Sequence, residues 1–311
     1  MTENTVNPVV VGVDGTDTSI GAARWAAAIA SKLGAPLHIV HARPYPGHNL
    51  TDAVAAARAA EMAAAEKGGP AILAAAVRAV HRDFSELRIT TANVSETIDR
   101  LLVDMSQHAR LIVLGCDEVK PGAAIVVGST TVAVAANATC PVVAWRGYAT
   151  APTGQPIVIG VDGDDDSRVA TTAAFELAQR LSVSIVAVHA WSARRSLGDV
   201  SLPFMVDWDA VQAHERERLV KALAPWTRLY PEVDVKYVVD RDKPSRALLR
   251  HSGDAQLVAI GSRGLGPLLG SLLGSTGLNL LHHSLIPTMI CRSVSASSDF
   301  PSESRFNERT R

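Results

Sequence analysis

Hydrophobic positions divide the chain into short β-branched runs and longer segments rich in alanine and leucine. The short runs show no polar alternation, which is typical of parallel strands buried on both faces. The longer segments have the length of helices that cover such strands. In the first half of the chain the pattern predicts strands near residues 9–13, 37–42, 87–91, 111–115 and 141–145, and helices near 19–33, 52–82, 95–108 and 129–138.

The second half of the chain repeats the first. Residues 9–15, VVVGVDG, return as IVIGVDG at 157–163, which is 148 positions later. Residues 111–115, LIVLG, return as LVAIG at 257–261, which is 146 positions later. Such a repeat indicates a duplicated domain. We expect an α/β fold with two tandem open parallel five-stranded sheets flanked by helices, a Rossmann-like arrangement.

Composition sets the expected boundaries of the two copies. Residues 1–148 form the first predicted domain and residues 156–293 the second, with a Pro-, Thr- and Gly-containing linker between them. Residues 294–311 are rich in serine and charge and have no apolar period, so we expect a disordered tail.

Charge and cysteine content argue against several classes of partner. The 30 basic and 31 acidic side chains leave a net charge of −1, without the basic excess that a nucleic-acid backbone requires. Three widely separated cysteines form no Cys-x-x-Cys pair, which fits a reducing, cytoplasmic compartment. The polar start of the chain predicts no export signal, and charges interrupt the most apolar long stretch, residues 53–80. We therefore expect neither nucleic acid nor a membrane as a partner.

A glycine-rich loop in the second half carries the strongest functional signal. The sequence GSRGLGPLLGSLLGST, at 261–276, begins where a predicted strand ends and leads into a predicted helix. Glycine lets backbone amides approach a ligand closely, and amides at a helix start favour an anion. Asp162 ends the first strand of the same half, where it can reach a ribose or an adenine edge. The pattern favours a nucleotide site over the alternative, in which the glycines merely permit turns.

Two common nucleotide-binding motifs do not match this chain. A dinucleotide fold needs G-x-G-x-x-G after the first strand, where residues 160–166 read GVDGDDD, an acidic turn hostile to pyrophosphate. A P-loop needs a lysine, which residues 270–276 lack. The spacing Gly261, two residues, Gly264, nine residues, Gly274-Ser275 closely resembles the ATP-binding motif of the universal stress protein family. The resemblance covers residues 7–292 in two copies and is greatest to the tandem actinobacterial type.

The resemblance implies an adenine nucleotide alpha hydrolase-like fold that binds ATP, alone or with Mg²⁺, with adenine near the first two strands and phosphates on the glycine loop. The positions that it assigns to the nucleotide are Gly160, Val161, Asp162, Val188, Gly261, Ser262, Arg263, Gly264, Leu265, Gly266, Gly274, Ser275 and Thr276. Their counterparts in the first half are Gly12, Val13, Asp14, Val40, Gly115, Gly128 and Ser129. Arg263 either adds positive charge to the loop or is simply solvated.

The first half departs from the motif. Glu118 stands where the second half has Gly264, and Asp117 precedes it. A carboxylate at about 4 Å from a phosphate costs roughly 4 kcal/mol at an effective dielectric constant near 20. We hypothesise that the first half has lost nucleotide binding, unless Lys120 offsets the charge or the loop turns Glu118 outward.

The remaining histidine, aspartate and cysteine side chains that could carry chemistry are interpreted as structural. His41 and His189 recur at the same strand end without a nucleophile or a metal-spaced partner, which favours a structural or adenine-side role. The histidines at 282–283 have no acidic ligand three or four residues away, so we assign no metal. The aspartates at 164–166 are interpreted as a helix start rather than a Mg²⁺ site. Cys116 is interpreted as an inert small residue rather than a reactive thiol.

These features predict an ATP-binding tandem universal stress protein that regulates stress response or growth through conformation or an unidentified protein partner. No general base or cation pair accompanies the glycine loop, so any hydrolysis is expected to be slow. The alternatives are an ATPase or phosphotransferase whose base lies in residues 191–208, and a structural interaction module without nucleotide. The last strands, 141–145 and 287–291, are apolar edges. The family implies that they pair the halves as a pseudo-dimer, and we expect two chains to form a homodimer.

Overall fold

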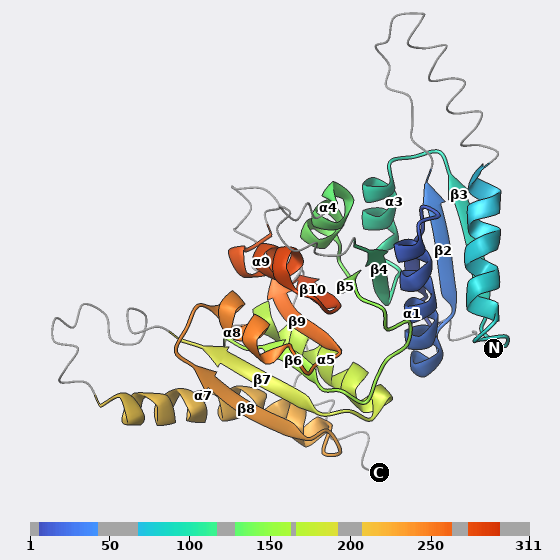
Figure 1. The fold of residues 1–311 in the computed structure, drawn as a ribbon. Helices are drawn as coiled ribbons and strands as arrows, with labels where there is room; N and C mark the ends of the chain where they lie inside the picture. The colour runs from blue at the N-terminus through green and yellow to red at the C-terminus, as the bar shows by residue number, and fades with distance from the viewer. Residues whose placement is uncertain are drawn as a thin grey trace, which may run out of the picture.

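The computed structural model describes residues 6–42, 68–116, 128–162, 166–191, 207–262 and 273–292. The strands of the first half are β1 Val9–Gly12, β2 Leu37–Ala42, β3 Ile89–Val94, β4 Leu111–Gly115 and β5 Val142–Trp145. Those of the second half are β6 Ile157–Gly160, β7 Ile185–Ala190, β8 Val235–Asp240, β9 Leu257–Ser262 and β10 Thr288–Arg292. They form one ten-stranded sheet in the order β3-β2-β1-β4-β5-β10-β9-β6-β7-β8 (Figure 1). The strands of each half run parallel, so the predicted fold class is confirmed.

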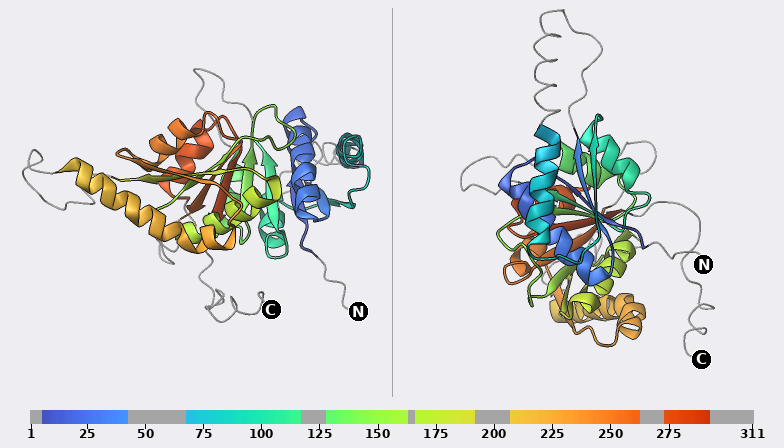
Figure 2. Two further views of the ribbon diagram at one scale, coloured as in Figure 1. Left: turned by 90° about the horizontal axis from the view of Figure 1, so that it is seen from below. Right: turned by 90° about the vertical axis from the view of Figure 1, so that its right-hand side faces the viewer.

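Helices cover both faces of this sheet (Figure 2). One face carries α1 Asp17–Leu33, the helix through residues 68–81, α5 Asp166–Leu181 and α7 Trp208–Leu229. The other face carries α3 Ile98–Met105, α4 Ser129–Asn137, α8 Pro244–His251 and α9 Ser275–His283. Successive strand residues serve opposite faces, so Val9 and Val11 belong to one core and Val10 to the other. None of the described helices is long and apolar enough to cross a membrane.

Local signals fix the ends of α1. Thr16 is its N-cap, and the Thr16 hydroxyl accepts a hydrogen bond from the Ser19 N–H at 3.2 Å. Gly34 ends the helix in the left-handed conformation, with φ of 63°, which glycine adopts without a steric penalty. Only four residues separate the end of β1 from the start of α1, so α1 begins at the edge of the sheet where the parallel strands end.

The two halves join through β5 and β10, which pair antiparallel with Val142 opposite Ile290 and Ala144 opposite Thr288. The expected pairing of the last strands is therefore present within one chain. Arg146 follows β5 and donates a hydrogen bond to the Ser284 carbonyl at 3.1 Å. Arg292 ends β10 and donates to the Ala136 carbonyl at 2.7 Å. Each half thus binds a helix end of the other half, as expected of a pseudo-dimer.

Two elements of the first half differ most from their predicted bounds. β3 begins at Ile89 rather than near 87, because the preceding residues form a turn in which the Leu87 N–H donates to the Phe84 carbonyl at 3.3 Å. α3 ends at Met105, because the Ser106 hydroxyl donates to the Val103 carbonyl at 2.6 Å and the chain turns there. The predicted helix at 52–82 is described from residue 68 onward, and the predicted tail at 294–311 lies outside the described residues.

Candidate functional site

A cavity of about 290 Å³ opens where the strands β6, β7 and β9 end, and the first turns of α5, α8 and α9 complete its wall. In open α/β sheets, ligands bind at this edge. The lining residues are Gly160, Val161, Asp162, Ser167, Val188, Ala190, Pro244, Leu248, Ile260, Gly261, Ser262, Gly274, Ser275, Thr276 and Gly277.

The cavity brings together the predicted site residues of the second half that the structure describes. They are Gly160, Val161, Asp162, Val188, Gly261, Ser262, Gly274, Ser275 and Thr276. Arg263, Gly264, Leu265 and Gly266 lie outside the described residues, as do the aspartates at 164 and 165. Segments distant in sequence therefore share one cavity, and their contact with a nucleotide stays a prediction.

Part of the cavity lining is polar. The N-cap of α9 is Gly274, with φ of −58° and ψ of 155°, and none of the described side chains caps this helix start. Ser275, Thr276 and the buried Ser262, which carry hydroxyl groups, also line the cavity. Uncapped amides at a helix start attract an anion, and hydroxyl groups add donors for its oxygens. These groups suit a phosphate.

The rest of the cavity lining is largely apolar. Val161, Val188, Leu248 and Ile260 are all buried and line the cavity. A Cβ atom on Gly160 would lie 3.1 Å from Ile260 Cγ2 and 3.2 Å from Leu248 Cδ1, so glycine allows these side chains to approach β6 closely. An apolar wall beside a few polar groups is typical of pockets for planar organic rings.

Six lining residues were absent from the sequence prediction: Ser167, Ala190, Pro244, Leu248, Ile260 and Gly277. Most of them share one signal, which is their position at a strand end or in the first turn of the helix that follows. Leu248 carries no such signal, because it lies a full turn into α8 and reaches the cavity through the packing of that helix on the sheet.

The histidine and cysteine side chains take up structural positions. Nδ1 of His189 lies 2.8 Å from the Val161 carbonyl oxygen, and Nδ1 of His41 lies 2.8 Å from that of Val13. Cys116 is buried, with its Sγ 3.4 Å from the Thr131 hydroxyl oxygen. Within the described part of the chain, no group of three or more His, Cys, Asp or Glu is arranged to hold a metal ion.

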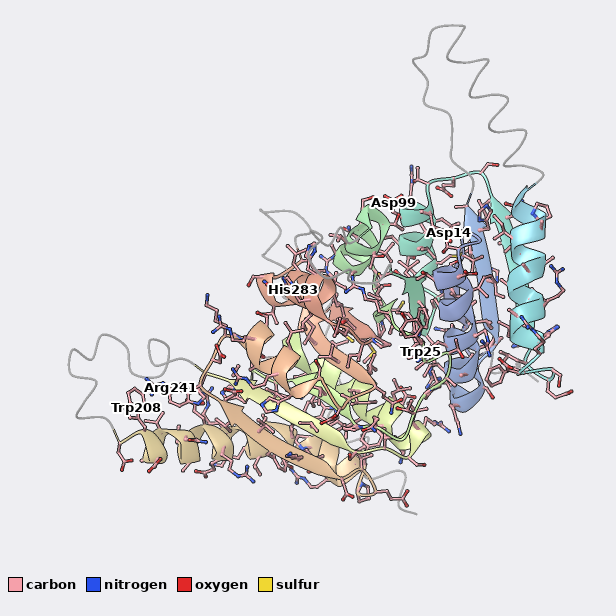
Figure 3. All side chains as sticks on the ribbon, in the orientation of Figure 1. Asp14, Trp25, Asp99, Trp208, Arg241 and His283 are labelled. Carbon is pink, nitrogen blue, oxygen red and sulfur yellow. The ribbon has the colours of Figure 1, made fainter. Side chains whose placement is uncertain are left out.

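The first half carries its predicted residues at equivalent positions: Gly12, Val13 and Asp14 at the end of β1, Val40 in β2, Gly115 at the end of β4, and Gly128 and Ser129 at the start of α4. Asp14 lies beside the start of α1 (Figure 3), where its Oδ1 accepts from the Thr16 N–H at 2.9 Å and from the Thr16 hydroxyl at 2.7 Å. Burial alone would raise the pKa of Asp14, but hydrogen bonds with Thr16 and Ser19 outweigh it and lower that pKa.

The surroundings of these residues differ between the halves. Cys116 stands where the second half has Ser262, Ile98 where it has Pro244, and Thr131 where it has Gly277. The first half therefore has a thiol where the second half has a hydroxyl group, and bulkier side chains at the other two positions. Asp117, Glu118 and Lys120 lie outside the described residues, so the predicted effect of Glu118 stays a prediction.

A duplicated chain with a cavity at the carboxyl edge of an open, mostly parallel sheet flanked by helices is a tandem α/β protein. The model of the universal stress protein family matches residues 5–146 and 154–292. The chain therefore belongs to the universal stress protein family and contains two tandem copies of its domain.

Relatives that match over most of their length support this assignment. A universal stress protein of Mycobacterium tuberculosis is 36% identical over 301 residues, covering 91% of this chain and 96% of that protein. A second one from the same organism is 34% identical over 307 residues, with the same coverage of both chains. A crystal structure of a universal stress protein from Archaeoglobus fulgidus, 15% identical, has a similar fold, with a TM-score of 0.68 over 92% of this chain and 98% of that one.

Proposed function

We propose that the chain binds ATP in the cavity of its second half and acts as a nucleotide-dependent regulator of stress response or growth. The observation that carries this proposal is the convergence of Gly160–Asp162 and Val188 with the starting residues of α9 in one cavity. The apolar lining side chains would contact the adenine, and the amides and hydroxyl groups at the start of α9 would bind the phosphates. Mg²⁺ would neutralise charge on the phosphates.

Charge near the cavity also favours an anion in the second half. Residues 240–246, DRDKPSR, carry three basic and two acidic side chains beside the lining residue Pro244. The equivalent residues 94–100, VSETIDR, carry one basic and two acidic side chains, including Asp99 on α3 (Figure 3). Together with Glu118, this charge pattern supports a first half that binds no nucleotide and serves as a structural partner.

The lining of the cavity supports a regulator rather than a fast enzyme. Asp162 is the sole titratable side chain among the described residues that line it. Phosphoryl transfer relies on cations placed around the phosphates and on a residue that positions the nucleophile. Hydrolysis would therefore be slow, and the nucleotide would act through conformation, through a protein partner in the cytoplasm, or through association of two chains.

Calorimetric titration of the full chain with ATP and Mg²⁺ tests this function, and we expect one site per chain. Nucleotide released from freshly purified protein by acid gives an independent measure of occupancy. Absence of both binding and released nucleotide would contradict the proposal and favour a structural module. Rapid multiple-turnover release of phosphate would instead favour an ATPase.

A further inference from the structure

A buried polar cluster lies directly behind the wall of the cavity. His189 on β7 is 8% exposed and Glu215 on α7 is 3% exposed. His189 Nδ1 lies 2.8 Å from the Val161 carbonyl oxygen, and His189 Nε2 lies 3.1 Å from Glu215 Oε2. Arg218 donates to the same carboxylate oxygen at 2.8 Å. The imidazole ring therefore connects α7 to the strand end that lines the cavity.

His189, Glu215 and Arg218 do not line the cavity. The cluster instead bonds to the backbone of Val161, which does line it. A carbonyl oxygen cannot donate, so Nδ1 of His189 supplies the hydrogen of its bond to Val161. The Val161 N–H in turn donates to the Val188 carbonyl at 3.0 Å, so both polar backbone groups of Val161 are fixed. Val188 and Ala190 line the cavity, whereas His189, between them on the strand, contacts the opposite layer.

The first half keeps the histidine but has no carboxylate at the matching position. The buried Leu219 of α7 and Leu73 of the helix through 68–81 are 146 positions apart, which aligns Glu215 with Gly69. A Cβ atom on Gly69 would lie 2.7 Å from Asn93 Nδ2, so the Asn93 side chain packs closely against this position. Burial of a carboxylate and an imidazole costs more free energy than burial of apolar side chains. The second half, which carries the intact glycine motif, retains this unfavourable burial.

We propose that His189, held in place by Glu215, is a positioning residue of the nucleotide site. It fixes the peptide between Val161 and Asp162, and so sets the orientation in which Asp162 and the adjoining wall meet the nucleoside. The inference rests on the proposed function, since the fixed peptide affects affinity only where a nucleotide binds.

Two leucine substitutions in the full chain test the role of this hydrogen bond. His189→Leu and His41→Leu each remove one imidazole bond to the carbonyl after the first strand of a half. Each variant loses one such bond to a backbone carbonyl, but only the second half is proposed to bind nucleotide. We therefore expect His189→Leu to weaken ATP binding about tenfold or more, and His41→Leu to change it less than about twofold. Thermal unfolding of both variants measures the cost to folding. Equal losses of ATP affinity would overturn the inference.

If the leucine substitutions disturb folding, conservative substitutions at the same positions still test the role of His189. His189→Asn retains a donor near the position of Nδ1, whereas His189→Gln extends toward Glu215, so we expect the asparagine variant to keep more affinity. Glu215→Gln retains an acceptor for Nε2 and should bind ATP better than Glu215→Leu.

Hydrogen exchange without nucleotide separates the two proposals. We expect amides at residues 160–162 to exchange faster in His189→Leu than in the unchanged protein, whether or not ATP binds. Faster exchange in a protein that never binds ATP would refute the proposed function, while still showing that His189 fixes the peptide after Val161. Unchanged exchange and unchanged affinity, in a protein that binds ATP, would refute the positioning role alone.

Discussion

Gly274 and Gly128 are equivalent N-cap residues, of α9 and α4, and they provide a matched pair of substitutions. A Cβ atom on either glycine meets no atom of the described residues within 4 Å. Valine at an N-cap costs about 1 kcal/mol of stability, and that cost should be similar in both variants. Gly274 lines the cavity, so we expect Gly274→Val to weaken ATP binding about tenfold, equivalent to about 1.4 kcal/mol.

Gly128→Val is the control, and calorimetric titration compares the two proteins. We expect its ATP affinity and stoichiometry to match those of the unchanged chain, because the first half is proposed to bind no nucleotide. Loss of a second binding site in Gly128→Val would show that the first half also binds.

The cysteine side chains lead to a second prediction at this scale. Cys116, Cys140 and Cys291 are all buried. Burial raises the pKa of Cys140 to about 12, and burial together with the nearby Cys140 raises the pKa of Cys291 strongly. The thiolate is the reactive form, so a disulfide reagent at pH 8 should label the native protein very slowly and all three thiols after denaturation. Rapid labelling of Cys116 in the native protein, located by peptide mass analysis, would contradict the inert role assigned to that residue.

At the scale of elements, α1 and β5 meet through a small and a large side chain. A Cβ atom on Gly21 would lie 2.5 Å from Trp145 Cη2. The equivalent positions of the second half hold Val169 and Cys291, the reverse combination of sizes. Gly21→Val should therefore destabilise the protein by about 1–3 kcal/mol through overpacking, and Trp145→Cys by about 3–5 kcal/mol through a cavity.

The double variant, Gly21→Val with Trp145→Cys, transplants the second-half pair into the first half. Its loss of stability in urea unfolding should be smaller than the sum of the single losses, because the valine occupies part of the space that the indole leaves. Strict additivity would show that the two positions do not share this space.

Elements were predictable because each strand is a compact β-branched run. Residues 37–42 and 111–115 were placed at their observed bounds, since nothing in their neighbourhoods competes with burial on both faces. The bounds of β3 and α3 were less accurate, because turns held by single hydrogen bonds, such as that of Ser106, leave no periodic pattern in the sequence.

The lining of the cavity was predictable where its residues lie near the end of a strand or begin a helix. Val188 and Ser275 belong to that group, and the repeat located both. Glu215 was not predictable as the partner of His189, because their contact depends on how α7 lies on the sheet and the first half has glycine at the matching position. Leu248 is similar, because the angle of α8 brings it to the cavity.

At the scale of the whole molecule, the pairing of β5 with β10 makes one continuous sheet from two domains (Figure 1). Arg146 and Arg292 are 146 positions apart, so they are equivalent residues of the repeat. Each donates to a carbonyl near the C-terminal end of a helix in the other half, where a cation also interacts favourably with the helix dipole. The two halves are thus held across the central strands by two equivalent arginines, although the acceptors differ, since Ser284 matches residue 138 of the first half rather than Ala136.

The two arginines differ in burial, and this predicts unequal contributions. Arg146 is 4% exposed, whereas Arg292 is partly exposed. A hydrogen bond from a charged group contributes about 1.5–3 kcal/mol, and more of that is lost when the site is buried. In urea unfolding, Arg146→Met should therefore destabilise the chain more than Arg292→Met does. Equal effects would contradict the view that burial sets the strength of this contact.

The same variants test how two chains associate. The edges of β5 and β10 are already paired within the chain, so a homodimer has to use another surface. Light scattering should then give the same molar mass for Arg146→Met, Arg292→Met and the unchanged protein at equal concentration. A fall in mass for either variant would indicate that association involves the central strands, with the halves exchanging partners between chains.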